Sequence, residues 1–147
     1  MIGFIPKGRF KAIMAQMPIL SVDIVCLNQG RVLLLKRKGN LTGYNGLWAT
    51  PGGRIFRDER VKAAAKRIMA REAGIKISRE SFAVCGIVEL LRPVEHSVTV
   101  VALAESQTPE VRLDETSSAY KWADPETATL NRFYRQVLKV GLKGRKA

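Results

Sequence analysis

The residues between positions 51 and 75 combine a glycine turn with basic and acidic side chains at spacings that suit phosphate and metal chemistry. The stretch begins with Pro51-Gly52-Gly53, ends near Gly74 and carries the carboxylates Asp58, Glu59 and Glu72. Glycine lets backbone groups approach a phosphate closely, and carboxylate oxygens bind hard divalent cations. Residues 54–76, however, contain eight Lys/Arg residues against three acids. A cation that binds here must therefore overcome a positive surrounding charge.

Three positions near the end of this stretch share one face of the helix that its sequence predicts. Positions 68, 71 and 72 are three and four residues apart, and they hold Ile68, Arg71 and Glu72. Ile68 extends an apolar stripe and is expected to pack against a sheet. Glu72 is expected to point from the end of that stripe into a cleft. The alternative is an exposed Glu72 that pairs with Lys76, four residues later.

The spacing of the whole stretch resembles the Nudix box. Gly53 is followed by five residues and Glu59, then by seven residues and Arg67, and the pattern closes with Glu72 and Gly74. In this family the helix carries Arg-Glu, two residues and Glu-Glu, and the pattern usually marks Mg²⁺-dependent hydrolases of nucleoside diphosphates linked to another group. The first two of these three acidic ligands are absent here. The resemblance implies an α/β fold, a Nudix-type α/β/α sandwich with a mixed β-sheet, in a single domain over residues 1–147.

The incomplete box is most similar to that of one subgroup, the GDP-mannose mannosyl hydrolases, which also lack the first two helix acids. Four further segments resemble this subgroup in order and approximate spacing: PILSVDIV, Lys36-Arg37, GLWATPGGR and DETSSAYKW. Thr116 and Ser117 stand where the subgroup has a metal-binding glutamine and a histidine general base. The identity of the base therefore stays open, with Glu115, Glu89 and Glu59 as candidate carboxylates.

Carried over residue by residue, the resemblance implies a metal site and a catalytic set. The carbonyl of Gly52 and the carboxylate of Glu72 would hold Mg²⁺, for which Mn²⁺ can substitute. Arg37 and Arg54 would neutralise the diphosphate, since a forked guanidinium matches phosphate oxygens. The implied catalytic residues are thus Arg37, Arg54 and Glu72.

The resemblance also implies how the substrate is bound. The substrate-binding residues would be Asp23, Arg37, Arg54 and Arg67. Asp23 would lie near the sugar, and Arg67 would either pair with Glu59 or face the phosphates.

Hydrophobic patterns predict the elements that position these residues. Helices are predicted at 7–16, ended by Pro18, at 60–73, capped by Asp58 and ended by Gly74, and from Asp124-Pro125 toward the carboxyl end. Strands are predicted in a hairpin that turns at residues 28–30, in FAVCGIVELL, in HSVTVVALAE and at 120–122. Asp23 falls on the face of the first strand opposite Val22 and Ile24, and Arg37 ends the second strand.

Composition restricts the class of protein and its partners. The 147 residues are 46% hydrophobic, the net charge is +12, and no apolar run approaches the roughly 20 residues of a membrane span. We therefore expect a cytoplasmic protein with no membrane partner, buried thiols at Cys26 and Cys85, and a flexible basic tail at about 143–147. The basic charge favours an anionic partner, either a phosphorylated small molecule or nucleic acid, and we expect the phosphorylated small-molecule substrate before nucleic acid. A homodimer is compatible with the sequence.

Two functions follow from these features. The first is a Mg²⁺-dependent hydrolase of a nucleoside diphosphate derivative, with a nucleotide sugar such as GDP-mannose as the leading substrate. The second is a non-catalytic module that binds a nucleotide or RNA on a degenerate Nudix scaffold. The missing acids and the basic tail favour the second function. Retention of Arg37, Gly52, Arg54 and Glu72 favours the first.

Overall fold

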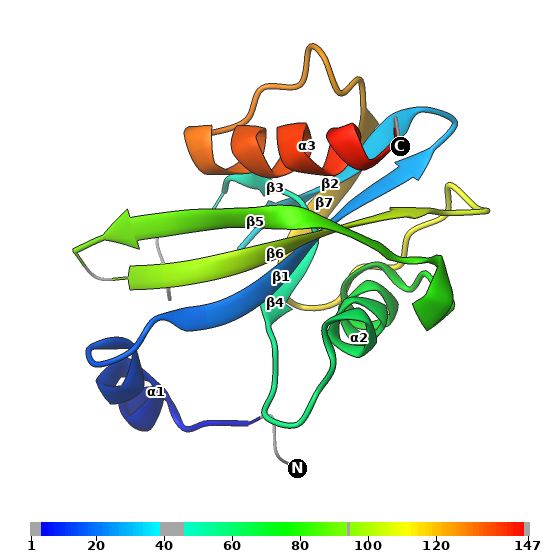
Figure 1. Ribbon diagram of the computed structural model, residues 1–147. Helices are drawn as coiled ribbons and strands as arrows, with labels where there is room; N and C mark the ends of the chain where they lie inside the picture. Colours follow the sequence, from blue (N-terminus) through cyan, green and yellow to red (C-terminus); the bar gives the residue numbers. More distant parts are fainter. Residues whose placement is uncertain (1–3, 39–45, 94, 146–147) are drawn as a thin grey trace.

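The computed structural model describes residues 4–38, 46–93 and 95–145, and these form a mixed sheet between helices (Figure 1). The strands are β1 (Ile19–Asn28), β2 (Arg31–Arg37), β3 (Trp48–Ala49), β4 (Gly52–Arg54), β5 (Ala83–Arg92), β6 (Glu95–Glu105) and β7 (Ser117–Ala123). The helices are α1 (Lys7–Met14), α2 (Val61–Ala73) and α3 (Arg132–Gly144), with a short 3₁₀ turn at Arg79–Ser81. This confirms the predicted α/β/α sandwich and its mixed sheet.

Strand β1 is the centre of the sheet and brings distant segments together. It runs parallel to β6 and antiparallel to β2 and β4, and the main order of strands is β3-β2-β1-β6-β5. The register sets Asp23 opposite Gly52 and Val22 opposite Gly53. On the other side, β7 pairs with β2, and a shift in register after Lys36 sets Arg37 opposite Ser117. The pairing of the strands therefore places the glycine turn, Asp23 and Arg37 close together.

The two faces of β1 bury two separate cores. Val22 and Ile24 face α2 and pack with Ile68, which is 2% exposed, as predicted from the stripe on that helix. Val25 faces α3 and packs with Val137. Full burial of one such aliphatic side chain stabilises the fold by about 1.5–3 kcal/mol. The layers visible in Figure 1, with α2 and α3 on opposite sides of the sheet, thus follow from the alternation of β1.

The start of α2 differs from the prediction. Asp58 does not cap the helix: it has a left-handed backbone (φ 64°), and the N-cap is Arg60, which makes no side-chain cap bond. The turn before the helix is closed instead by Glu59, whose Oε1 accepts a hydrogen bond from the amide of Phe56 at 3.0 Å. At the other end the prediction is confirmed, because Gly74 adopts the left-handed conformation (φ 66°) that ends the helix.

The last helix begins later than its sequence pattern indicates. Asp124 accepts a hydrogen bond from the amide of Glu126 and closes a turn, whereas α3 begins at Arg132. Its N-cap is Asn131, whose side chain accepts from the amide of Tyr134 at 2.9 Å. The helix continues to Gly144, so it includes the first residues of the expected basic tail, and residues 146–147 lie outside the described residues.

The two cysteines, both expected to be buried thiols, differ in their burial. Cys26 is buried, whereas Cys85, on the edge strand β5, is only partly buried. In the described part of the chain, no helix has the length and apolar composition needed to cross a bilayer.

Candidate active site

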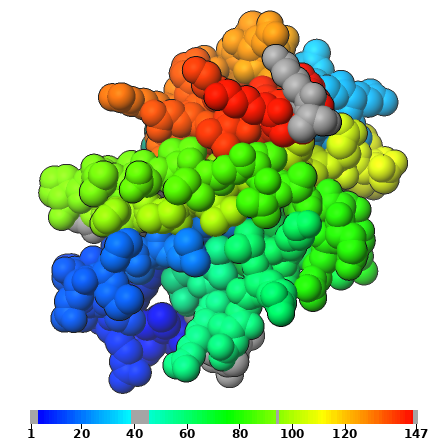
Figure 2. All heavy atoms as spheres, viewed as in Figure 1, coloured from blue at the N-terminus to red at the C-terminus, as the bar shows by residue number. Residues whose placement is uncertain are grey.

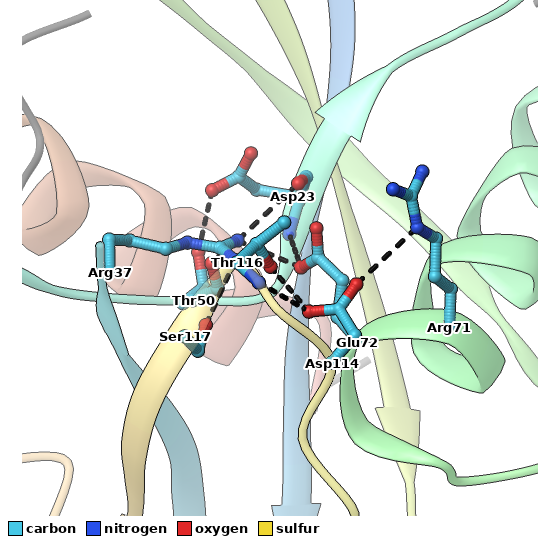
Figure 3. Close-up of polar contacts among 9 residues, drawn as sticks. Asp23, Arg37, Thr50, Arg71, Glu72, Asp114, Thr116 and Ser117 are labelled. Carbon is cyan, nitrogen blue, oxygen red and sulfur yellow. Dashed lines mark hydrogen bonds and ion pairs between the residues drawn. The ribbon is translucent and has the colours of Figure 1, made fainter. Parts of the chain in front are cut away.

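Arg37 lies at the centre of a network of polar groups at the end of β2 (Figure 3). Its Nη2 donates to Glu72 Oε1 at 2.8 Å, and the two side chains are only 13% and 12% exposed. The same nitrogen lies 3.3 Å from the carbonyl oxygen of Thr50 and 3.4 Å from that of Gly52. Arg37 is therefore bound mainly by one short, charge-assisted hydrogen bond.

Glu72 points into this network from the last turn of α2. Its Oε1 also accepts a hydrogen bond from the amide of Gly52 at 3.2 Å. Burial raises the pKa of Glu72, and the neighbouring Arg37 opposes that rise. The alternative of an exposed glutamate paired with Lys76 does not describe this side chain, because the glycine turn and Arg37 enclose it.

Asp23 lies directly beneath the glycine turn. Its Oδ2 accepts a short hydrogen bond of 2.6 Å from Thr50 Oγ1, and its residue is 7% exposed. Loss of solvation on burial raises the pKa of Asp23 to about 7, despite the opposing hydrogen bond from Thr50 and the charge of Arg37. A Cβ atom at Gly52 would collide with the Asp23 carboxylate, so position 52 requires glycine.

Thr116 and Ser117, where the chain enters β7, contact the other terminal nitrogen of Arg37. Its Nη1 lies 3.4 Å from Thr116 Oγ1 and 3.3 Å from Ser117 Oγ. Thr116 Oγ1 in turn donates to Asp114 Oδ1 at 2.6 Å. The two residues that replace the subgroup's glutamine and histidine therefore serve as acceptors for Arg37.

Arg71, which occupies one of the family's acidic positions, is paired with two acids of the segment just before β7. Its Nε lies 3.4 Å from Asp114 Oδ2, and its Nη2 lies 3.2 Å from Glu115 Oε1. Asp114 and Thr50 were not among the residues selected from the sequence. The Asp-x-Thr spacing in DETSS is a typical signal for a side-chain turn and could have identified Asp114.

Arg54 and Arg67 form a second cluster around Phe56. The guanidinium carbon of Arg67 lies 3.7 Å and that of Arg54 4.8 Å from the centre of the Phe56 ring. Arg54 also lies 5.6 Å from the ring of Phe10 on α1, and Figure 2 shows a hollow between α1 and the segment that joins β4 to α2. Burial lowers the pKa of Arg54, and the charge of Arg67 lowers it further.

Arg67 pairs with Glu59, the first of the two roles expected for it. Its Nε donates to Glu59 Oε2 at 2.7 Å and its Nη2 to Glu59 Oε1 at 2.9 Å. A further bond of 3.0 Å joins Nη2 to the carbonyl of Arg54. Arg67 thus fixes the turn that carries Arg54, and it lies in the second cluster rather than in the Arg37 network.

We predict that Glu59→Gln lowers the free energy of unfolding by about 1 kcal/mol, because it removes a charge-assisted hydrogen bond from the partly buried Arg67. Urea unfolding at neutral pH measures the change. Glu126→Gln, which alters an exposed glutamate, serves as the control. Equal stability of both variants would show that the Arg67 pair adds nothing to the fold.

The oxygens around Arg37 Nη2 are the part of the network that suits a cation. Glu72 Oε1 and the carbonyls of Thr50 and Gly52 all lie within 3.4 Å of this positively charged nitrogen. The described residues include no group of three His, Cys, Asp or Glu side chains placed to hold a metal. A divalent cation would thus find Glu72 and the Gly52 carbonyl here and would take its remaining ligands from a bound substrate.

A glycine turn and a helix-borne glutamate on a mixed sheet between helices define a domain of the Nudix type. Residues 17–140 match the NUDIX domain, so the chain belongs to the Nudix family, whose hydrolases act on nucleoside diphosphate derivatives.

The chain is similar to solved structures and to one curated relative. The MutT protein from Methanosarcina mazei Go1 has a TM-score of 0.77 and 25% identity, over 90% of this chain and 99% of that one. The MutT NUDIX hydrolase from Burkholderia pseudomallei has a TM-score of 0.74 and 28% identity, over 84% of this chain and 98% of that one. The low-salt glycan biosynthesis protein Agl8 of Haloferax volcanii is 36% identical over 77 residues, which are 52% of this chain and 48% of that protein. The chain therefore matches about half the length of this relative.

Proposed function

We propose that the chain is a Mg²⁺-dependent hydrolase of a nucleotide sugar, with GDP-mannose as the leading substrate. The observation that carries the proposal is the convergence of Arg37, Glu72 and Gly52 in one network. The name of the relative from Haloferax volcanii refers to glycan biosynthesis, a process that uses activated sugars, and this agrees with such a substrate.

In this proposal two arginines bind the diphosphate and Glu72 with Gly52 holds the metal. Arg37 and Arg54 supply forked donors to phosphate oxygens, and Arg67 keeps the turn that carries Arg54 in place. When bound, Mg²⁺ would supply positive charge that stabilises the leaving phosphate oxygens. Glu72 and the Gly52 carbonyl would be its protein ligands.

Asp23 is the residue to which we assign the general base. Of the three candidates from the sequence, Glu59 is bound to Arg67, Glu115 is paired with Arg71, and Glu89 lies on the edge strand β5. Asp23 lies against Gly52, and its pKa of about 7 lets it accept a proton from water near neutral pH.

Phosphorus NMR of reactions with a panel of nucleotide sugars and Mg²⁺ tests the function. Attack of water at the sugar carbon releases GDP and mannose, whereas attack at phosphorus releases GMP and mannose phosphate. We expect products from GDP-mannose. Absence of products from every substrate, together with measurable binding, would favour the second candidate, a binding module. Arg71 at an acidic position of the box is the observation that favours that second candidate.

We predict that Arg54→Ala lowers kcat/KM about 10- to 100-fold, since a charge-assisted hydrogen bond to substrate contributes about 1.5–3 kcal/mol. The thermal midpoint should fall slightly, because the variant loses the contacts of Arg54 with Phe10 and Phe56. Steady-state kinetics and thermal unfolding measure both effects. The control is Arg57→Ala, whose side chain is 86% exposed. Unchanged kinetics in Arg54→Ala would assign Arg54 a structural role.

A further inference from the structure

We propose that Arg37 is an exchangeable internal cation that keeps divalent metal out of the site until a diphosphate binds. In the free protein its guanidinium occupies the position between Glu72 and the carbonyls of Thr50 and Gly52. A diphosphate then draws the guanidinium onto its own oxygens and opens that position to the metal. This inference rests on the proposed function, because it assigns an order of binding to the same site.

The lengths of the hydrogen bonds of Arg37 indicate that its guanidinium can be displaced from Glu72 by another partner. One contact is short, the 2.8 Å hydrogen bond from Nη2 to Glu72 Oε1. The other four are long, between 3.3 and 3.4 Å, and go to Thr50, Gly52, Thr116 and Ser117. Bonds of this length are weak, so exchange of the guanidinium requires mainly a new partner to replace Glu72.

Arg37 and a metal cannot share this position. A divalent ion bound to Glu72 Oε1 and the Gly52 carbonyl would take the two oxygens that Arg37 Nη2 faces at 2.8 and 3.4 Å. The ion and the guanidinium would then be like charges within a few ångströms, in a region where both Arg37 and Glu72 are nearly nine-tenths buried. Such repulsion is poorly screened away from water. Metal binding therefore requires the guanidinium to move.

A diphosphate can cause this movement. It offers two adjacent oxygens that match the guanidinium fork, whereas Glu72 accepts from Arg37 through the single oxygen Oε1. Once Arg37 has turned to the phosphates, Glu72 and the Gly52 carbonyl are free to bind a metal, and the phosphates supply further oxygens. Diphosphate must then increase metal affinity, and metal must increase diphosphate affinity by the same factor.

The backbone around Arg37 can stay in place during the exchange. The amide of Arg37 donates to the carbonyl of Leu47 at 2.9 Å, and the amide of Lys38 donates to the carbonyl of Thr116 at 3.0 Å. These bonds fix the end of β2 on both sides. The exchange therefore needs only rotation of the Arg37 side chain.

Titration with Mn²⁺ in the absence of nucleotide, followed by electron paramagnetic resonance of the free ion, tests the inference. We expect Arg37→Met to bind Mn²⁺ at least 10-fold more tightly than the wild type. The gain should disappear in the double variant Arg37→Met/Glu72→Gln. Arg79→Met removes one exposed arginine and should bind Mn²⁺ as the wild type does. The inference is overturned if Arg37→Met shows no gain, or if the gain survives loss of the Glu72 charge.

A second test uses only the wild-type protein, so it does not require any substituted protein to fold. In ¹⁵N NMR spectra, Mn²⁺ alone should leave the amide signals of Gly52 and Gly53 sharp, and Mn²⁺ with GDP should broaden them. Broadening by Mn²⁺ alone at the same concentration would overturn the inference. Failure of the proposed function has a different signature: GDP would not shift these amides and no nucleotide sugar would be hydrolysed, while Arg37→Met would still gain Mn²⁺ affinity.

Discussion

Replacement of Glu72 with Gln is expected to lower kcat/KM for the nucleotide sugar by at least about 100-fold. Gln keeps the size of the side chain and an oxygen that can accept from the Gly52 amide. It removes the negative charge that pairs with Arg37 and would bind the metal. A hundredfold loss corresponds to about 2.7 kcal/mol, which lies within the range for hydrogen bonds to charged groups. Steady-state kinetics at saturating Mg²⁺ measures the loss.

The same variant should also be less stable, by about 1–3 kcal/mol. Arg37 is 13% exposed, and loss of its partner leaves a largely buried charge. Urea unfolding measures this change, and Glu80→Gln, at an exposed position, is the control for both experiments. Activity of Glu72→Gln within threefold of the wild type would show that Glu72 only anchors Arg37 and takes no part in the reaction.

The elements that the sequence predicts well depend on local patterns. The apolar stripe and Gly74 define α2 because helical spacing and a left-handed glycine act within a few residues. The hairpin of β1 and β2 follows from a turn at Gln29 and Gly30, both with positive φ. The prediction that Asp58 caps α2 is wrong, although Asp is a good capping residue. At this position the turn needs a left-handed backbone, which a local pattern does not reveal.

The contacts of the site residues depend instead on how distant elements pair and pack. Sequence spacing indicates that Gly52, Arg37 and Glu72 belong to a site, but it does not predict that Arg37 binds Glu72. That contact arises because α2 packs on β1 while β2 pairs with β1, and together these contacts bring residues 35 positions apart within 2.8 Å. Likewise, the role of Arg71 becomes clear only when the segment before β7 places Asp114 beside it.

The last prediction concerns stability and pH at Asp23. Asp23→Asn should stabilise the protein at pH 8, and the gain should shrink as the pH falls toward 4. The carboxyl has a pKa of about 7 in the folded protein, mainly because burial removes its solvation, against 3.8 as the ordinary value. Between these two values the folded state holds a proton that the unfolded state releases. The wild type therefore loses stability as the pH rises through this range, and above it the folded state contains a buried charge.

A shift of this size corresponds to about 4 kcal/mol at 1.36 kcal/mol per pK unit, which we take as an upper bound. Asn avoids the charge and can still accept the hydrogen bond from Thr50 Oγ1. Urea unfolding of both proteins from pH 4 to pH 8, without metal or nucleotide, measures the difference, and the acidic end of the series is the internal control. Parallel stability curves would show that the carboxyl is ionised in the folded protein throughout this range.

The stability that the protein is expected to lose through the charge of Asp23 suggests a function for this residue. An ionised carboxylate that destabilises the fold needs a compensating role, because an amide side chain could accept the same hydrogen bond from Thr50 without a buried charge. If Asp23 is the base, Asp23→Asn should give a more stable protein with strongly reduced kcat. Asn cannot take a proton from water, whereas it retains the contact with Thr50 that positions the glycine turn. A variant that is both more stable and fully active would assign proton transfer to another group.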